Sequence, residues 1–365
     1  MLRVDVDARM LRAGGIGRYI RGVVGPWLCD HAVESVRLYG RTADLDAWLT
    51  HIGAQGNIEI VAWGDPTYSL SAQARWPRLS RRGAAWRPDV SFFPHFDAPL
   101  LLHPRPSAVV VHDLIHLRVP TAFPFWKRRL AAGMIRRVAR LTDQIVTVSE
   151  SSRADILAFV GPEAPPVDVV RNGVSDLFTP GIPDGQGADP FLLVVAPHKP
   201  HKNLLLAAQV LLRLRQHEGW RLVLVGPNAS DRRELAREAG APGLVDAIDL
   251  PGRVADQELR SLYRRASVVL VPSLLEGFAL PALEARACGT RVLAPDVPWA
   301  GELSDMGVEL IAGWDPDTWV RSVRSTSIAK KDHALSPPTI PRWSQASAAT
   351  LSLLERVADR TPLGG

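Results

Sequence analysis

The stretch ASVVLVPSLLEGFALPALE, residues 266–284, decides how the second half of this chain folds. Its first six residues are mostly branched apolar, which is typical of a strand buried on both faces of a parallel sheet. A turn containing Gly277 follows, and a helix is expected to begin near Pro281. N–H groups at the start of a helix have no partner within it and attract anions. The stretch therefore predicts an anion-binding site.

Two carboxylates belong to the same stretch, Glu276 at the expected turn and Glu284 one turn into the expected helix. Carboxylates in these places can accept hydrogen bonds from sugar or ribose hydroxyls, while N–H groups of the turn hold phosphate or sugar oxygens. An ordinary surface helix with two solvated Glu side chains would show the same spacing. For the pair alone, the ordinary surface helix is the favoured interpretation.

The longer string SLLEGFALPALEARACGT, residues 273–290, resembles the signature of retaining GT-B glycosyltransferases of the family 4 type (group 1), which include mannosyltransferases. The resemblance implies that Glu276 accepts hydrogen bonds from the sugar and that Glu284 binds the ribose diol. It also implies three backbone N–H donors, those of Phe278, Ala279 and Leu280.

Length and composition agree with a globular enzyme of two domains. The chain has 365 residues, of which 46% are hydrophobic and 22% charged. Cys29 and Cys288 match no metal spacing and fit a reducing cytoplasm. Residues 1–7 read as a first strand rather than a leader peptide. The net charge of +5 fits anionic substrates or an anionic membrane surface and does not by itself indicate nucleic acid.

Short apolar runs alternate with helical patterns along the whole chain, which predicts βαβ units around parallel sheets. The expected strands of the first half are 2–6, 33–39, 58–61, 90–93, 108–111, 145–148 and 167–170. Those of the second half are 191–196, 221–225, 247–250, 268–271, 291–294 and 307–311, with helices at about 202–217, 230–239, 256–265 and 281–288.

The expected architecture is α/β, with two Rossmann-like, doubly wound domains and a ligand cleft between them. We expect an N-terminal acceptor-side domain over 1–180, a nucleotide-sugar domain over 181–335 and a tail over 336–365. Residues 178–190, rich in Gly and Pro, are the expected linker. The helix expected over 343–357 follows Ser336-Pro337-Pro338 and resembles the family's tails, which cross back onto the first domain.

A glycine cluster follows the first expected strand in the string RAGGIGRY, residues 12–19. Glycines let the backbone approach a bulky anion closely, although a flexible turn would look the same. The string resembles the family's first loop, which contacts the donor diphosphate. The resemblance implies this role for Gly14, Gly15 and Gly17.

Cations follow the first strand of the second half in the string APHKPHKN, residues 196–203. Departure of a nucleoside diphosphate needs positive groups where negative charge grows. Related enzymes often carry an Arg at the position of His198, so Lys202 is the main candidate, with His198 or Lys199 as the second donor-binding group. A basic solvated loop is the alternative.

The string HDLIH, residues 112–116, follows another strand. His and Asp suit divalent ions, but no further ligands have suitable spacing, and His116 fits a core histidine. The string resembles a family element beside the sugar and acceptor. It implies that His112 contacts the donor hexose and that Asp113 orders the loop or the acceptor hydroxyl.

Two further segments have structural interpretations. Ser149 is expected to be the N-cap of a helix that has Ser152 or Arg153 in its first turn. Residues 125–141 form a basic amphipathic helix, either a core helix with a solvated basic face or a helix that docks on anionic lipid.

The resemblance thus implies a retaining, metal-independent hexosyltransferase of glycan or glycoconjugate biosynthesis. It would act in the cytoplasm, with docking at the inner membrane face left open. His112, Asp113, Lys202 and Glu276 are the catalytic candidates. The donor is a substrate, with GDP-mannose first and UDP- or dTDP-hexoses open, and no cofactor is expected; the acceptor is a carbohydrate or a lipid-linked hydroxyl. There are two alternatives: a catalytically silent scaffold that binds a sugar nucleotide, and an enzyme with another GT-B chemistry, such as an epimerase or a phosphorylase.

Overall fold

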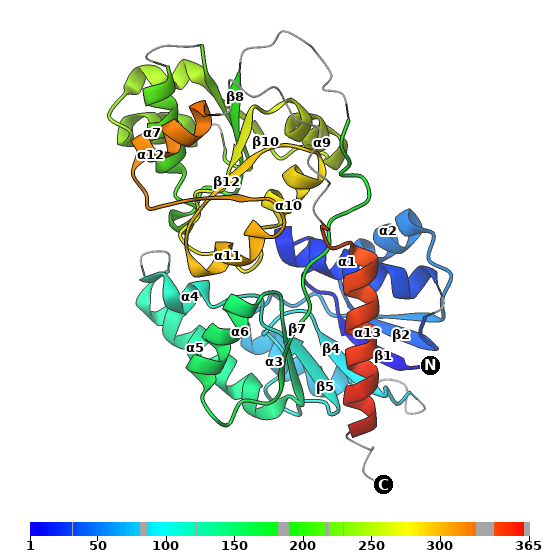
Figure 1. Ribbon diagram of the computed structural model, residues 1–365. Coiled ribbons are helices and arrows are strands. Elements are labelled where there is room, and N and C mark those ends of the chain that lie inside the picture. Colours follow the sequence, from blue (N-terminus) through cyan, green and yellow to red (C-terminus); the bar gives the residue numbers. More distant parts are fainter. Residues whose placement is uncertain are drawn as a thin grey trace. The chain divides into compact units, whose positions relative to one another are not determined.

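The computed structural model describes residues 1–30, 32–80, 86–120, 123–181, 190–215, 219–228, 230–325 and 339–360. The chain forms two compact units (Figure 1). Unit 1 comprises Met1–Leu117, Phe125–Gly173 and the segment from Pro341 on, and unit 2 comprises Arg118–Pro124 and Val174–Ile340. Most of the expected linker (182–189) and the Ser336-Pro337-Pro338 segment lie outside the described residues.

Unit 1 is built on a seven-stranded sheet of order β3-β2-β1-β4-β5-β6-β7, in which every pair is parallel. Strand β1 lies beside β4, so the chain winds outward from this point in both directions. The strands are β1 (Arg3–Asp7), β2 (Ser35–Gly40), β3 (Ile58–Ala62), β4 (Val90–Phe93), β5 (Ser107–Val110), β6 (Gln144–Thr147) and β7 (Val167–Val169).

The helices that connect these strands are α1 (Gly14–Cys29), α2 (Thr42–Ile52), α3 (Leu70–Leu79), α4 (Ile115–Arg118), α5 (Phe125–Leu141) and α6 (Glu150–Val160). The cap expected at Ser149 is confirmed, because its Oγ accepts a hydrogen bond of 3.1 Å from the Ser152 N–H. Among the described residues, every helix is too short or too polar to cross a bilayer.

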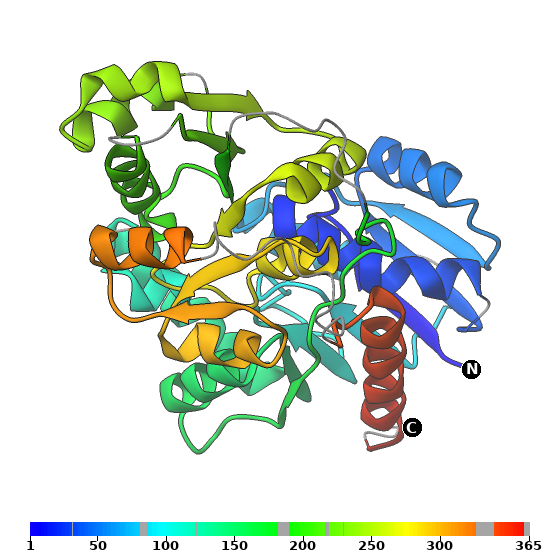
Figure 2. The ribbon, with the colours of Figure 1, turned by 45° about the horizontal axis from the view of Figure 1, so that its top comes forward.

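The C-terminal helix α13 (Trp343–Arg360) packs on α1 within unit 1, and Figures 1 and 2 show the two side by side. Ser347 Oγ donates to the Val23 carbonyl over 2.7 Å. The indole of Trp343 occupies the space above Gly22, where an added Cβ would lie 2.2 Å from the ring. The missing side chain at Gly22 is therefore what lets the tail approach α1.

Unit 2 repeats the same design with a six-stranded parallel sheet of order β10-β9-β8-β11-β12-β13. Its strands are β8 (Phe191–Val195), β9 (Arg221–Val225), β10 (Ile248–Gly252), β11 (Val268–Leu270), β12 (Val292–Pro295) and β13 (Glu309–Ile311). The helices are α7 (Leu204–Leu214), α8 (Asp231–Glu238), α9 (Asp256–Arg265), α10 (Leu280–Ala287), α11 (Pro298–Ser304) and α12 (Pro316–Arg324), with short 3₁₀ turns η2 (Pro200–Lys202) and η3 (Pro242–Ala247).

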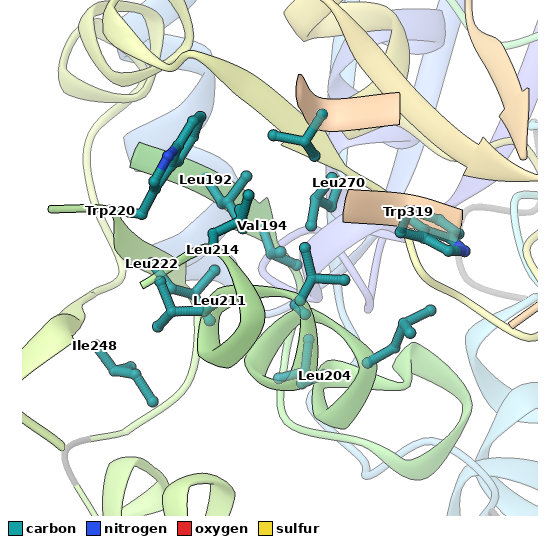
Figure 3. Close-up of a cluster of buried hydrophobic side chains, with 14 of the residues drawn as sticks. Leu192, Val194, Leu204, Leu211, Leu214, Trp220, Leu222, Ile248, Leu270 and Trp319 are labelled. Carbon is teal, nitrogen blue, oxygen red and sulfur yellow. The ribbon is translucent and has the colours of Figure 1, made fainter. Parts of the chain in front are cut away.

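Each sheet has its own apolar core. In unit 2 the core combines strand residues such as Leu192 and Leu222 with Leu211 of α7 and Trp319 of α12 (Figure 3). In unit 1 it is aromatic, with the rings of Tyr39, Trp63 and Trp76 packed together at centroid distances of 5.1–6.3 Å. The large apolar area buried in both cores is the main source of stability.

Both units therefore have the expected doubly wound fold, and every expected strand is found within two residues at each end. In such sheets ligands bind beyond the carboxyl ends of the strands, where the strand order reverses. That point lies between β1 and β4 in unit 1 and between β8 and β11 in unit 2.

Candidate functional site

Lys202 and Glu276 meet at the point of unit 2 where the strand order reverses. Lys202 ends η2, which follows β8, and Glu276 lies in the loop after the neighbouring β11. Lys202 Nζ donates to both carboxylate oxygens of Glu276, over 2.6 and 2.8 Å. The two side chains are 16% and 12% exposed, so the pair is largely shielded from water and still reachable. These two predicted site residues are thus brought together.

Further hydrogen bonds fix the two loops. Ser273 Oγ donates to Glu276 Oε1, and the Leu274 N–H donates to the His201 carbonyl over 2.7 Å. Ser273 and His201 are themselves buried. The ion pair is thus held in place by its surroundings, which is the preorganisation that a site for charged ligands requires.

The start of α10 lies beside this pair. Within the described residues, the N–H groups of Phe278, Ala279 and Leu280 donate to no other group of the protein. Ala279 has a left-handed backbone (φ 46°), a conformation that costs a non-glycine residue about 1 kcal/mol. Backbone strain of this kind gathers at ligand sites. The turn and the helix start that the sequence predicted are present, and the binding of an anion there stays a prediction.

Glu284 lies on the buried side of α10. Its side chain is only 1% exposed, and its Oε2 accepts a hydrogen bond of 3.0 Å from Tyr263 Oη of α9. Tyr263 is fully buried and was not singled out from the sequence. The carboxylate therefore lies between α10 and α9, and its expected role toward a ribose stays a prediction.

The second candidate for the cationic site, His198, turns toward α8. Its Nδ1 lies 3.2 Å from Asp231 Oδ1, while Lys199 is exposed. His198, Asp231 and Glu234 form the one group among the described residues whose His, Cys and carboxylate donor atoms are close enough for a metal ion. His112, Asp113 and His116 are not part of it.

The three glycines of the cluster in unit 1 differ in their surroundings. Gly14 (φ 33°) and Gly15 are exposed with open space where a side chain would lie, and the Gly15 N–H at the start of α1 has no described acceptor. At Gly17, by contrast, a Cβ would lie 2.2 Å from the Leu11 carbonyl oxygen. The first two are therefore open to a ligand, whereas Gly17 is required by packing.

His112 and Asp113 follow β5. The His112 ring packs edge-on against Tyr19, with centroids 4.9 Å apart, and its Nε2 lies 3.0 Å from the Pro94 carbonyl oxygen. Because a carbonyl only accepts, Nε2 carries the proton, and the neutral ring keeps Nδ1 as an acceptor. Burial lowers the pKa of His112, which favours this neutral form. Asp113 Oδ1 accepts from the Ile115 N–H over 3.0 Å and so orders the loop.

A second polar cluster in unit 1 escaped the sequence analysis. Arg9, after β1, forms ion pairs with Asp7 (2.7 Å) and Asp97 (3.3 Å) and is 3% exposed. Asp97 also accepts from the Tyr68 N–H over 2.8 Å. Burial raises the pKa of Asp97 to about 6, although Arg9 opposes this shift. These residues follow three different strands. Their position just after strand ends is the only feature of the sequence that could have indicated the cluster.

His95, after β4, completes this cluster. Its Nδ1 accepts from the Asp97 N–H over 3.1 Å, and its Nε2 lies 2.9 Å from Tyr68 Oη. Tyr68 has a left-handed backbone (φ 61°) and is 41% exposed. Burial lowers the pKa of His95 well below its usual range, and nearby His112 and His116 lower it further. The edge thus presents neutral imidazoles and hydroxyl groups, which suit uncharged hydroxyl ligands.

Comparisons with known proteins agree with this geometry. The family described as "Glycosyl transferases group 1" matches residues 182–333, and "Glycosyltransferase Family 4" matches residues 57–176. Together the two matches cover most of both units.

Individual relatives point the same way. An MMP α-(1→4)-mannosyltransferase of Mycolicibacterium hassiacum is 33% identical over 44% of this chain, and a D-inositol 3-phosphate glycosyltransferase of Xylanimonas cellulosilytica is 31% identical over 62%. The chain spans only 39% and 60% of the length of these two relatives. The Anabaena protein HepE, solved in complex with UDP-glucose, shares the fold, with a TM-score of 0.70 at 17% identity over 99% of both chains.

The matches to both family regions, the two doubly wound units and the Glu276–Glu284 string agree with one another. The chain belongs to the GT-B glycosyltransferases of group 1, of the family 4 type.

Proposed function

We propose that this protein transfers a hexose from a nucleotide sugar to a hydroxyl acceptor, with retention of the α configuration and without a metal ion. The observation that carries the proposal is the Lys202–Glu276 pair beside the N–H groups at the start of α10, which have no acceptor among the residues that the structure describes. A cation and oriented backbone dipoles match a diphosphate, and a carboxylate matches sugar hydroxyls. All three occur at one edge of unit 2.

In the proposed reaction the acceptor oxygen forms a bond to the anomeric carbon of the sugar. The bond from that carbon to the diphosphate breaks, and its electron pair moves to the diphosphate oxygen. Lys202 and the N–H groups of Phe278, Ala279 and Leu280 stabilise the growing negative charge. The acceptor proton passes to the departing phosphate oxygen. Attack and departure on the same face give retention, so no second carboxylate is needed as nucleophile.

The two units take different parts in this proposal. Unit 2 holds the diphosphate and, through Glu276, the sugar. Unit 1 supplies His112 as a neutral hydrogen-bonding partner for the hexose, with Gly14 and Gly15 open to the donor. The polar cluster around Tyr68 and His95 offers partners for a carbohydrate acceptor.

GDP-mannose is the donor that we propose first. The name of the mannosyltransferase relative supports it, whereas HepE, solved with UDP-glucose, keeps UDP-hexoses in consideration. We place the reaction in the cytoplasm, in glycan or glycoconjugate biosynthesis. The free cysteines Cys29 and Cys288 suit a reducing compartment.

A donor screen tests the proposal. Thermal shift with GDP-, UDP- and dTDP-hexoses should raise the melting temperature for one nucleotide class, and the same donor should release nucleoside diphosphate in the presence of sugar acceptors. Binding without any cleavage of the donor, across acceptor types, would point to a silent sugar-nucleotide-binding scaffold. Stabilisation by no nucleotide sugar would contradict the site itself.

A further inference from the structure

We propose that the outer face of α5 is a docking surface for an anionic lipid bilayer. This surface consists of Phe125, Trp126, Arg129, Leu130, Gly133, Arg136, Arg137 and Arg140. The inference concerns where the protein works, and it stands whether or not the donor assignment is right.

The surface follows from the geometry of the helix. α5 has 17 residues and is therefore about 25 Å long. Its inner face packs Ala131, Met134, Ile135, Val138 and Ala139 into the core of unit 1. At 3.6 residues per turn, the eight residues named above share the opposite side, and all of them are exposed. The inner face accounts for the fold of the helix and leaves the outer face unexplained.

Large apolar side chains lie at the start of this outer face. Phe125, Trp126 and Leu130 are 67%, 62% and 49% exposed. Single exposed apolar residues are common on protein surfaces, but two aromatic rings and a leucine within six residues form a patch. Aromatic rings flanked by cations are the side chains that proteins place at membrane interfaces.

Cations accompany the patch along the whole helix. α5 contains six of them, Lys127, Arg128, Arg129, Arg136, Arg137 and Arg140, and no Asp or Glu. Lys127 Nζ lies 5.3 Å from the Trp126 ring and Arg129 Cζ lies 5.6 Å from the Phe125 ring, so charge and aromatic surface are adjacent.

These charges are hardly compensated by the protein itself. Within the described residues, Glu163 is the one carboxylate that pairs with a cation of α5, at 3.6 Å from Arg140. A row of Arg side chains that has one carboxylate partner in the described part of the chain, together with adjacent exposed aromatic rings, complements both lipid phosphates and acyl chains. A nucleic acid would satisfy the charges and leave the aliphatic and aromatic patch exposed, so a bilayer fits both halves of the surface.

Vesicle co-sedimentation of the full chain tests this. We expect binding to vesicles of phosphatidylcholine with about 30% phosphatidylglycerol at about 50 mM salt, weak binding to phosphatidylcholine alone, and release at about 500 mM salt. Arg129→Glu with Arg137→Glu should lower the partition coefficient about tenfold or more. Phe125→Ser with Trp126→Ser should lower it by a similar factor without weakening the salt dependence.

Matched controls lie in unit 2. Arg233→Glu with Arg237→Glu on α8 makes the same change of net charge on another exposed helix, and Trp314→Ser removes another exposed indole. Both controls should bind vesicles like the wild type, and all variants should keep their melting temperature and donor affinity. Equal losses in the α8 and α5 variants would overturn the proposal in favour of net charge alone. Vesicle binding that is unchanged in the α5 variants would overturn the proposal as well. So would a wild-type protein that is a dimer in solution when only the α5 variants are monomeric, because the surface would then be a dimer interface.

Discussion

The reversal points of the two sheets share one topology and carry opposite chemistry. Unit 2 has at this point a lysine, a carboxylate and backbone N–H groups that donate to no group in the described part of the chain. In unit 1 the same position presents imidazoles whose pKa burial lowers, Tyr68, and the buried Arg9 with its two carboxylates. One edge is therefore suited to a charged leaving group and the other to uncharged hydroxyl groups.

The fold sets where ligands bind, and the loop residues set which ligands they are. Both edges arise from strands of similar apolar sequence. What separates them is the half-dozen residues after each strand.

Lys202→Ala should have the largest effect. It removes the cation proposed to stabilise the departing diphosphate and leaves Glu276 without its partner, so kcat should fall about 10²–10³-fold. Lys199→Ala, an exposed neighbour on the same loop, should change kcat only a few-fold. Steady-state rates of nucleoside diphosphate release measure both effects. A Lys202→Ala enzyme that keeps more than half of its activity would refute the proposal that this cation stabilises the departing diphosphate.

His112→Ala should reduce kcat by about 10²-fold through lost hydrogen bonding, while the donor Kd changes little because the diphosphate stays on unit 2. In the wild type this imidazole is neutral, since burial lowers its pKa. Its protonation should therefore cause no loss of activity between about pH 8 and about pH 6.5. A Kd that weakens in parallel with kcat would place His112 in ground-state binding instead.

Gly17→Ala and Gly15→Ala separate packing from ligand access. The new Cβ at position 17 would meet the Leu11 carbonyl at 2.2 Å, and unit 1 should lose about 2–3 kcal/mol of stability. Position 15 has open space, so its variant should keep the melting temperature and weaken donor binding. Scanning calorimetry measures the melting temperature of each variant, and isothermal titration measures its donor affinity. Similar melting temperatures for both variants would show that the loop before α1 accommodates a Cβ at position 17 without loss of stability.

Asp5→Asn probes burial of charge in unit 1. Burial raises the pKa of Asp5 to about 6, although Trp86 and Tyr39 donate hydrogen bonds to it. Because the folded carboxyl keeps its proton more tightly than the unfolded one, its contribution to stability falls as pH rises from about 4 to about 6. Relative to Asp5→Asn, the wild type should lose about 2 kcal/mol between pH 4 and pH 8. Denaturant titrations with a pH-independent difference would contradict this.

Much of the fold could be predicted because apolar runs and breakers are local signals. The run at 266–271 became β11 (Val268–Leu270), and the helix expected near Pro281 begins at Leu280. The helical tail could likewise be predicted from the helical spacing of its apolar residues. Gly22 and Gly173 lie where the chain around Trp343 packs closely.

The site was only partly predictable. Lys202 and Glu276 could be paired because both follow strands, and strand order then brings them to one edge. The turn of His198 toward Asp231 and the burial of Glu284 under Tyr263 depend on side chains from helices far away in sequence. The Arg9–Asp97–Tyr68–His95 cluster joins three loops with no motif in common. Contacts of this kind follow from tertiary packing, which no local pattern records.

In the proposed reaction the bond between sugar and diphosphate breaks at the Lys202 edge with retention. Proton NMR of donor turnover, recorded before the released sugar mutarotates, tests it directly. We expect nucleoside diphosphate together with a sugar or glycoside whose first-formed anomer is α, and loss of this signal with Lys202→Ala. A β anomer as the first product, or bound donor that stays intact with every acceptor, would contradict it.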